Sequence, residues 1–408
     1  MSVQQLKDID PRELGERLQN ARKARGLTQQ TVADFLGVAR TTVTAIEKGE
    51  RRLQATELAR LAARYGRSVA ELLRGGAAAT GFAVQLRSSW SPQQVLEESL
   101  DLHFEEFERL CDDYVELERL CAAPLPKKYP SPYEIGTLVP ERAAEDAAVS
   151  ERQRLGIGDG PLTNLRDVLE GDVGLRIFFM DLPSRISAIF GYKDELGGCI
   201  AVNRNHPVDR QRFSCAHEYG HFVSRRNVPE ITSTRRYQRV PEHERFADAF
   251  ARSFLMPGSG LTRRYNEVHR SREGKVTPAD LCRLADVYAV SFEAITRRLE
   301  ELRLLPPATL ERLQERGFRV REAQEILGIQ PRVEPEDMLP LRYRLLAAEA
   351  FQRGDLSEGQ FAKLLRVDRV EARRLAQKLA TDDELSSDGE IESTQLELSI
   401  PVSELRRA

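Results

Sequence analysis

An HExxH motif, His217-Glu218-Tyr219-Gly220-His221, lies near the middle of the chain and sets requirements for the fold around it. On a helix, residues four apart lie on one face, one turn above the other, so His217 and His221 could hold one metal ion between them. Glu218 would then lie beside the metal and could act as general base on a water molecule, as peptide hydrolysis requires. The rest of the site must come from elements that pack against this helix.

Composition limits the classes of protein to consider. The chain has 408 residues, enough for two or three domains, and 41% of them are hydrophobic, as is ordinary for a soluble globular protein. Its net charge of −3 means that any nucleic-acid surface must be local. Five scattered Cys without a CxxC pair indicate reduced thiols rather than a disulfide framework. With a polar N-terminus and no run of 18 apolar residues, we expect a cytoplasmic protein without a membrane partner.

The segment before the motif predicts a small sheet. Three strand-like segments, Leu175–Phe179, Ile186–Tyr192 and Cys199–Asn203, are separated by Pro183 and by two glycines. Helical patterns dominate elsewhere, so the fold class is expected to be mainly α with a small β-sheet, an α+β fold. The metal helix should pack on that sheet because it follows directly.

A third metal ligand is expected from the next helical segment, which Pro257 closes. Glu244 and Asp248 lie four residues apart and would face the same way. Glu244 could therefore bind the metal while Asp248 accepts a hydrogen bond from the outer nitrogen of a ligating His. Glu242 and His243 remain rivals for the ligand position.

Residues from about 143 to 305 resemble the ImmA/IrrE family of metallo-endopeptidases, which are gluzincins. The resemblance is carried by Ile200-Ala201-Val202-Asn203-Arg204-Asn205, by Arg212 to His221, and by Glu244-x-x-Ala247-Asp248-x-Phe250-Ala251 with Leu255-Met256-Pro257. It implies a zincin-like domain with zinc, or alternatively manganese, held by His217, His221 and Glu244, and Glu218 as the base. It also implies that the substrate is a repressor of the XRE type. Cys215 is expected to point away from the metal.

Peptide hydrolysis also needs a group that stabilises the oxyanion. Tyr237, in the basic loop Thr234 to Arg239, and His243 are the candidates for this catalytic role. The arginines of that loop are more simply interpreted as solvated charges.

Residues 11–74 predict an all-α helix-turn-helix domain. Thr28 is a suitable N-cap for a helix through Leu36, Gly37 makes the tight turn, and a third helix runs from about Arg40 to Lys48. The detail resembles the XRE (Cro/C1-type) family. That resemblance is carried by Arg25-Gly26-Leu27-Thr28-Gln29-Gln30, Ala33, Leu36-Gly37-Val38 and Val43 to Gly49.

The charge of this domain supports binding to double-stranded DNA. It contains thirteen Lys and Arg against seven Asp and Glu, an excess of six positive charges in an acidic chain. Arg40, Thr41 and Thr44 should face outwards from the third helix, with Arg40 as the candidate for a guanine edge. Gln29 is a candidate for a phosphate or base contact. The alternative is a dimerisation or protein-docking module whose charges are merely solvated.

The other segments complete the predicted organisation. A linker and a long amphipathic helix, from Pro92 to about Ala122, occupy 75–139, and the helix either dimerises or packs on the neighbouring domain. The peptidase domain is expected at 140–305 and a helical C-terminal module at 306–380. Residues 381–408 form an acidic tail that is expected to be flexible, with Leu396–Ile400 as an edge strand or docking peptide.

Together these features predict a DNA-binding transcriptional regulator with a metal-dependent endopeptidase domain. A homodimer is expected from the two-fold symmetry of operators, and a toxin or another operon-encoded protein is a further candidate partner. The alternative is a non-proteolytic transcription factor, or an antitoxin-like regulator, whose metal site is structural or sensory. The intact Glu218 favours the enzyme, because a structural site has no use for a carboxylate there.

Overall fold

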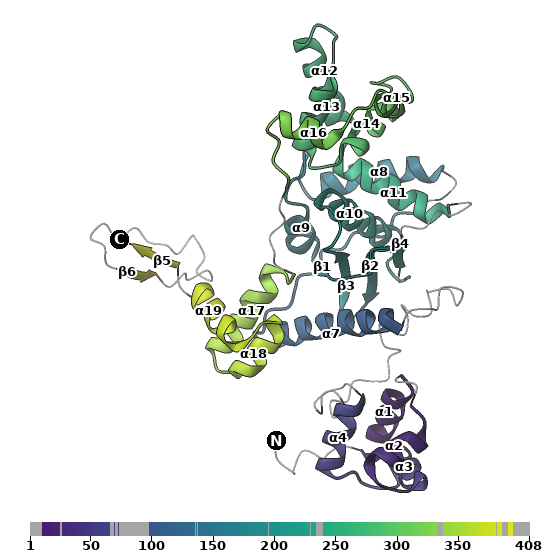
Figure 1. Cartoon of the computed structure of the whole chain (residues 1–408), viewed down its shortest axis with the longest axis vertical. Helices are drawn as coiled ribbons and strands as arrows, with labels where there is room; N and C mark the ends of the chain where they lie inside the picture. The colour runs from purple at the N-terminus through teal and green to yellow at the C-terminus, as the bar shows by residue number, and fades with distance from the viewer. Residues whose placement is uncertain are drawn as a thin grey trace. The chain divides into compact units, whose positions relative to one another are not determined.

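The computed structural model describes residues 10–24, 27–65, 69, 72, 98–134, 136, 138–194, 196–228, 230–233, 240–332, 338–380, 382–385 and 391–394. The chain divides into two compact units, Met1–Thr80 and Gly81–Ala408. Each unit is described separately below (Figure 1).

The described part of the first unit is helical, as the sequence predicts. Thr28 caps α2 because its hydroxyl accepts a hydrogen bond from the Thr31 amide, and Gly37 ends that helix with φ of 75°. The interior is built from apolar residues of every helix, including Leu18, Val32 and Ile46. The helices are α1 (Pro11–Ala24), α2 (Gln29–Leu36), α3 (Arg40–Glu47) and α4 (Ala55–Tyr65).

A buried ion pair ties α1 to α3 inside this unit. Arg22 Nε lies 2.5 Å from Glu47 Oε1, and the two residues are only 7% and 4% exposed. Arg22 also donates to the Leu27 carbonyl oxygen at 2.7 Å, and Glu47 accepts from Gln29 Nε2 at 2.9 Å. One carboxylate therefore fixes the ends of three helices relative to one another.

The second unit is organised around a four-stranded sheet. The strands are β1 (Arg176–Met180), β2 (Ile186–Lys193), β3 (Gly197–Asn203) and β4 (Glu230–Ser233), in the order β1-β3-β2-β4. β1 pairs with β3 in parallel, and the other pairs are antiparallel. The three predicted strands are present, while the short β4 has no counterpart in the sequence-based prediction.

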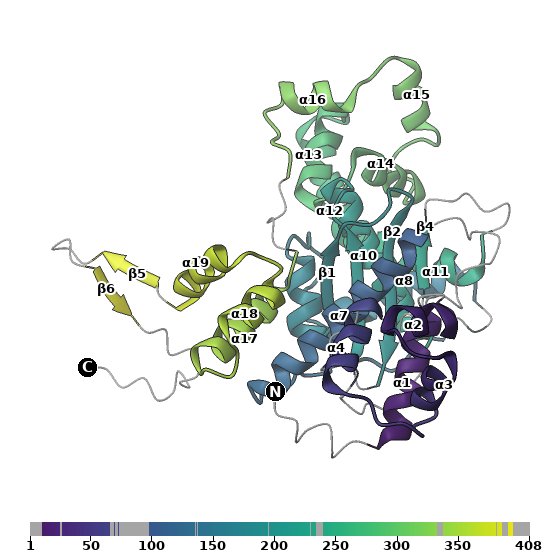
Figure 2. The same ribbon diagram turned by 60° about the horizontal axis from the view of Figure 1, so that its bottom comes forward.

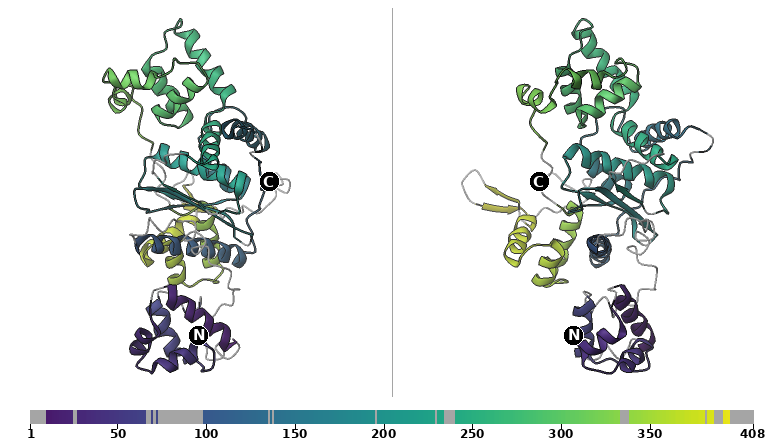
Figure 3. Two further views of the ribbon diagram at one scale, coloured as in Figure 1. Left: turned by 90° about the vertical axis from the view of Figure 1, so that its right-hand side faces the viewer. Right: turned by 45° about the vertical axis from the view of Figure 1, so that its right-hand side comes forward.

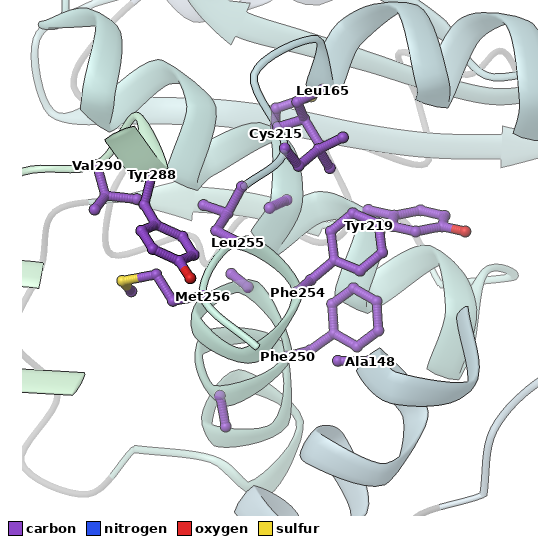
Figure 4. Packing of buried hydrophobic residues seen from close by; sticks show 14 of the residues in the cluster. Ala148, Leu165, Cys215, Tyr219, Phe250, Phe254, Leu255, Met256, Tyr288 and Val290 are labelled. Atoms are coloured by element: carbon purple, nitrogen blue, oxygen red, sulfur yellow. The ribbon is translucent and has the colours of Figure 1, made fainter. Parts of the chain in front are cut away.

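Helices cover one face of this sheet and build the larger core (Figure 1). Ile177 and Phe179 of β1 contribute to it, and Figure 4 shows how α11 residues Phe250 and Phe254 pack beside Tyr219. The elements on this side are α8 (Pro140–Arg154), α9 (Leu165–Asp167), the π-helix η2 (Val168–Val173), α10 (Val208–Arg225), α11 (Glu242–Leu255), α12 (Gly258–Ser271), α13 (Pro278–Tyr288), α14 (Phe292–Glu301), α15 (Thr309–Glu315) and α16 (Val320–Ile326).

The opposite face of the sheet is covered by segments far apart in sequence (Figure 3). Phe178 of β1 meets Tyr114 of α7 and Tyr343 of α17 in edge-to-face contacts, with ring centroids 6.2 and 6.5 Å away. The helices on this side are α7 (Glu98–Leu120), α17 (Leu341–Gln352), α18 (Glu358–Leu365) and α19 (Arg369–Ala380). The apolar stripe of α7 is thus buried within the chain, as the packing alternative for this helix requires.

The described helices of the C-terminal part are divided between the two cores of the second unit. Leu310 of α15 packs in the core that contains α10 residues. The helices from Leu341 onward pack in the other core, which contains α7 residues. The acidic stretch, predicted to be flexible, contains an antiparallel hairpin of β5 (Asp382–Leu385) and β6 (Ile391–Thr394). The predicted strand Leu396–Ile400 lies outside the described residues.

Among the described helices, none combines the length and apolar character needed to cross a membrane.

Candidate metal centre

Helix α10 carries two imidazoles whose Nε2 atoms point toward each other. His217 and His221 lie one turn apart and are 2% and 0% exposed, and their Nε2 atoms are 3.0 Å apart. The helix is held in place because Arg212, three residues before Cys215, donates to the Ala289 and Thr163 carbonyl oxygens at 3.0 and 2.8 Å. Cys215 is buried in the hydrophobic core and is not among the clustered donor atoms.

The neighbouring helix α11 supplies the carboxylate. Glu244 Oε2 lies 3.5 Å from His217 Nε2, and its Oε1 lies 3.5 Å from His221 Nε2. The two helices approach closely at Gly220, where a Cβ would lie only 3.0 Å from the Ala247 Cα. Gly220 and Ala247 are therefore positioning residues that the sequence-based prediction missed; a glycine inside a helical motif was the available signal.

The three side chains fit a zinc-type site. One donor atom from each of His217, His221 and Glu244 lies within 4.8 Å of the others. Ligands at ordinary zinc distances in tetrahedral geometry are about 3.3 Å apart, close to the 3.0 and 3.5 Å separations between donor atoms here. Two imidazoles and one carboxylate leave a fourth position open, which is the ligand pattern of catalytic rather than structural zinc.

Asp248 is hydrogen-bonded to the imidazole of His217, on the side away from the other candidate ligands. Its Oδ1 is 2.9 Å from His217 Nδ1, the nitrogen that faces away from Glu244. A carboxylate at this position fixes the imidazole tautomer that directs the Nε2 lone pair to the metal. Nδ1 of His221 has no such hydrogen-bond partner among the residues described, so the two ligands are supported unequally.

The charges of the site are strongly coupled. Burial lowers the pKa of His217, but the hydrogen bonds with Asp248 and Glu244 outweigh it and raise this pKa to about 10. Burial lowers the pKa of His221 to about 4. Burial also raises the pKa of Glu244, yet its hydrogen bonds with both imidazoles hold it well below the usual range. Two carboxylates thus surround His217, and a divalent cation bound beside them would balance their charge.

Two of the predicted catalytic residues, Glu218 and His243, lie on the neighbouring helices α10 and α11. Glu218 is fully buried beside the two ligands on α10. His243 Nε2 lies 3.8 Å from Glu244 Oε1, its ring centroid is 6.0 Å from that of His221, and its side chain is 28% exposed. Tyr237 lies outside the described residues. Glu242, the other rival ligand, is exposed and does not join the donor cluster.

A buried polar network anchors the opposite side of the metal helix. The Tyr219 hydroxyl donates to the Glu151 carboxylate of α8, a residue with no exposed surface. Arg154 pairs with the same carboxylate at 2.6 Å, and the Tyr133 hydroxyl donates to it at 2.9 Å. This network fixes the rotation of α10, so that the histidines face α11. No motif in the sequence points to Glu151.

The residues predicted to contact DNA lie at the start of α2 and on α3. Arg40 and Thr41 are exposed at the start of α3. Thr44 donates to Gln29 Oε1 at 3.3 Å, and Gln29 in turn donates to Glu47. Gln29 and Thr44 are thus held in fixed orientations next to the exposed end of α3.

Comparison with protein families matches both parts of the chain. Residues 170–300 match the IrrE N-terminal-like domain, and residues 18–72 match a helix-turn-helix family of the XRE type. The chain is a fusion of these two domains. It therefore combines a DNA-binding helix-turn-helix with a metallopeptidase-like domain, and the fusion predicted from the sequence is confirmed.

The other comparisons add less. None of the curated proteins compared with this fusion is a significant match. Among solved structures, ComR from Streptococcus suis is 12% identical and covers 91% of this chain and 94% of its own, with a TM-score of 0.16. PlcR from Bacillus thuringiensis, solved with the peptide PapR7 and DNA, is 10% identical and covers 90% and 94%, also with a TM-score of 0.16. Scores this low carry no structural argument.

Proposed function

We propose that the IrrE-like domain is a zinc-dependent endopeptidase whose substrate is a DNA-bound regulatory protein. The observation that carries this proposal is the convergence of His217, His221 and Glu244 at ligand separations, with Glu218 buried on the same helix. A structural zinc site would be closed by a fourth protein ligand, whereas the described residues supply three.

The roles of the side chains follow from their positions. His217, His221 and Glu244 would hold zinc, which when bound supplies Lewis-acid activation of a water molecule and of the scissile carbonyl. Glu218 would take a proton from the attacking water and later return it to the leaving amine. Asp248 orients His217 through Nδ1. His243 is proposed as a donor to the developing oxyanion because it lies beside Glu244 and is partly exposed.

The substrate class is proposed from the fusion itself. A helix-turn-helix in the same chain would concentrate the peptidase near proteins bound to DNA, which raises the effective concentration of such a substrate. Repressors of the XRE type are the substrates that the family resemblance implies. Dimerisation on an operator and pairing with a toxin or other operon-encoded protein stay predictions from the sequence.

A single substitution tests the chemistry. Glu218→Gln keeps the size of the side chain but removes its basicity, so cleavage of candidate XRE repressors should be lost while zinc content is retained. The zinc-loaded protein and the variant would be incubated with the repressors, including the chain's own first unit, and fragments identified by mass spectrometry. Zinc measured by elemental analysis separates lost chemistry from a lost site.

Two outcomes would count against the proposal. Equal cleavage by the zinc-loaded Glu218→Gln variant would exclude Glu218 as the base. The absence of products from any repressor encoded nearby, with zinc bound, would favour the regulator that does not cleave peptides.

A further inference from the structure

The C-terminal helices α18 and α19 repeat the local geometry of α2 and α3. Both first helices have eight residues, Gln29–Leu36 and Glu358–Leu365. Each is followed by one residue in the left-handed conformation, then a valine, then the N-cap of the next helix. The second helices start at equivalent positions, Arg40 and Arg369. The segment 357–380 lies outside both family matches.

The hydrogen bonds at the two turns also correspond. Ser357 caps α18 by accepting from the Gln360 amide, as Thr28 caps α2. Arg366 ends α18 with φ of 59°, where Gly37 ends α2 with φ of 75°. The amide of the following valine donates back to the fifth residue of the helix in both cases, at 3.0 Å for α2 and 3.1 Å for α18. The turn is therefore the same structure in both places.

The buried positions agree as well. In both pairs the fourth, fifth and eighth residues of the first helix and the fourth residue of the second helix are buried. Residues Val32, Ala33, Leu36 and Val43 fill these positions in the first unit, and Phe361, Ala362, Leu365 and Ala372 fill them at the C-terminal end. The inward faces of the two helix pairs thus match position by position.

Two further elements adjoin this helix pair, one before it and one after it in the chain (Figure 2). α17 packs across the pair, with the Tyr343 hydroxyl donating to the Leu364 carbonyl oxygen at 3.1 Å and Phe351 stacked on Phe361 at 4.7 Å. The hairpin of β5 and β6 follows α19 in the chain. Three helices followed by a two-stranded hairpin therefore form one connected element of the second unit.

The outward face of α19 is basic. Arg369 and Val370 occupy the positions of Arg40 and Thr41, and both are exposed. Arg373 and Arg374 follow, with 64% and 80% of their side chains exposed, although they also pair with Glu358 and Glu371 at 3.0 and 3.8 Å. Between residues 357 and 380 there are six Lys and Arg against three Asp and Glu. Arginines on the outer face of the second helix of such a pair are in the position to contact phosphates and base edges in the major groove.

We propose that α17, α18, α19 and the β5–β6 hairpin form a second DNA-binding element, with α19 as the helix that enters the major groove of double-stranded DNA. Asp382, Asp383 and Glu384 begin the hairpin, and their charge opposes phosphate. Contacts with the backbone must therefore come from α19 and the turn before it. Two readers on one chain would raise the affinity for operators that carry two sites.

The experiment weakens DNA binding by the helix-turn-helix of the first unit and measures the binding that remains. Full-length protein carrying Arg40→Ala and Thr41→Ala, both exposed positions, would be titrated into a fluorescent random-sequence DNA duplex at about 50 mM salt. We expect this protein to retain binding. Adding Arg369→Ala, Arg373→Ala and Arg374→Ala should weaken binding about tenfold or more. It should also reduce the salt dependence of log K by about 2.7, the value for three lost phosphate contacts.

Two further variants make the result specific. Replacing the same three arginines by Lys keeps the charge and should preserve most of the binding. As a matched control, Arg264→Ala, Arg270→Ala and Arg319→Ala remove three exposed charges elsewhere in the second unit and should change binding less than twofold. Circular dichroism would verify that each variant is folded.

The proposal is overturned if the protein carrying Arg40→Ala and Thr41→Ala no longer binds DNA, or if the α19 variant loses no more affinity than the matched control. Neither the metal site nor peptide hydrolysis enters this measurement.

Discussion

The buried pair of Arg22 and Glu47 makes the first unit sensitive to one substitution. Glu47→Ala would leave the Arg22 guanidinium buried without its carboxylate, and would remove the acceptor that holds Gln29. Breaking a buried ion pair from one side costs about 3–5 kcal/mol. The total stability of a small domain is about 5 kcal/mol, so most of it would be lost.

Hydrogen exchange measured by mass spectrometry on the full chain would localise this loss. Amides of α1 and α3 should exchange faster by about two to three orders of magnitude, the equivalent of 3–4 kcal/mol, while those of the second unit should be unchanged. Glu13→Ala is the matched control, because Glu13 pairs with Arg17 at 2.7 Å but is 62% exposed. An exposed pair of this kind contributes less than about 1 kcal/mol.

The same pair predicts a dependence on pH. Burial raises the pKa of Glu47, but its hydrogen bonds with Arg22 and Gln29 outweigh this and lower the pKa below its ordinary value. A carboxylate of this kind stabilises the fold above its ordinary pKa, and the stabilisation is lost as the pH falls through the lowered value. The difference between the native protein and Glu47→Ala should therefore narrow below about pH 4. A loss no larger than that of Glu13→Ala, or a difference independent of pH, would show that the Arg22–Glu47 pair does not stabilise the first unit in this way.

Two further substitutions test the metal site and its support. Asp248→Asn removes the charge that orients His217, so zinc affinity should fall about 10- to 100-fold in competition with a chromophoric chelator, and unchanged affinity would remove Asp248 from the site. Gly260→Ala would place a Cβ 1.7 Å from the Asp159 carbonyl oxygen and should destabilise the second unit by about 1–3 kcal/mol in urea unfolding. Gly171→Ala, which meets nothing within 4 Å, is the control; equal effects would contradict the predicted clash.

The grouping of candidate metal ligands could be predicted because each pair of side chains lies within one helical turn. The spacing of His217 and His221, and that of Glu244 and Asp248, follow directly from the period of an α-helix. What brings the two helices together is less visible in a sequence. The close approach at Gly220, and the Glu151 network that sets the rotation of α10, depend on contacts between segments far apart in the chain.

Other elements were missed for identifiable physical reasons. Strand β4 is only four residues long and is formed by pairing with β2, so its own pattern is too short to be informative. The turn between α18 and α19 was missed because Arg366 stands where Gly37 stands in the first unit. A left-handed residue other than glycine costs about 1–2 kcal/mol, and packing around Phe361 and Leu365 can offset it. A glycine-based signal cannot find such a turn.

The two faces of the sheet explain why the C-terminal helices belong with the peptidase fold. Residues of β1 alternate, so that Ile177 lies in the core with α10 while Phe178 lies in the core with α7 and α17. Without α7 and α17 the second face would expose Phe178, Ile189 and their neighbours to water, a loss of about 2 kcal/mol for each large side chain. The region matching the IrrE N-terminal-like domain, residues 170–300, therefore depends on segments before and after it. Helix α10, which carries the candidate metal ligands, and the proposed C-terminal DNA-binding helices therefore pack on opposite sides of one sheet.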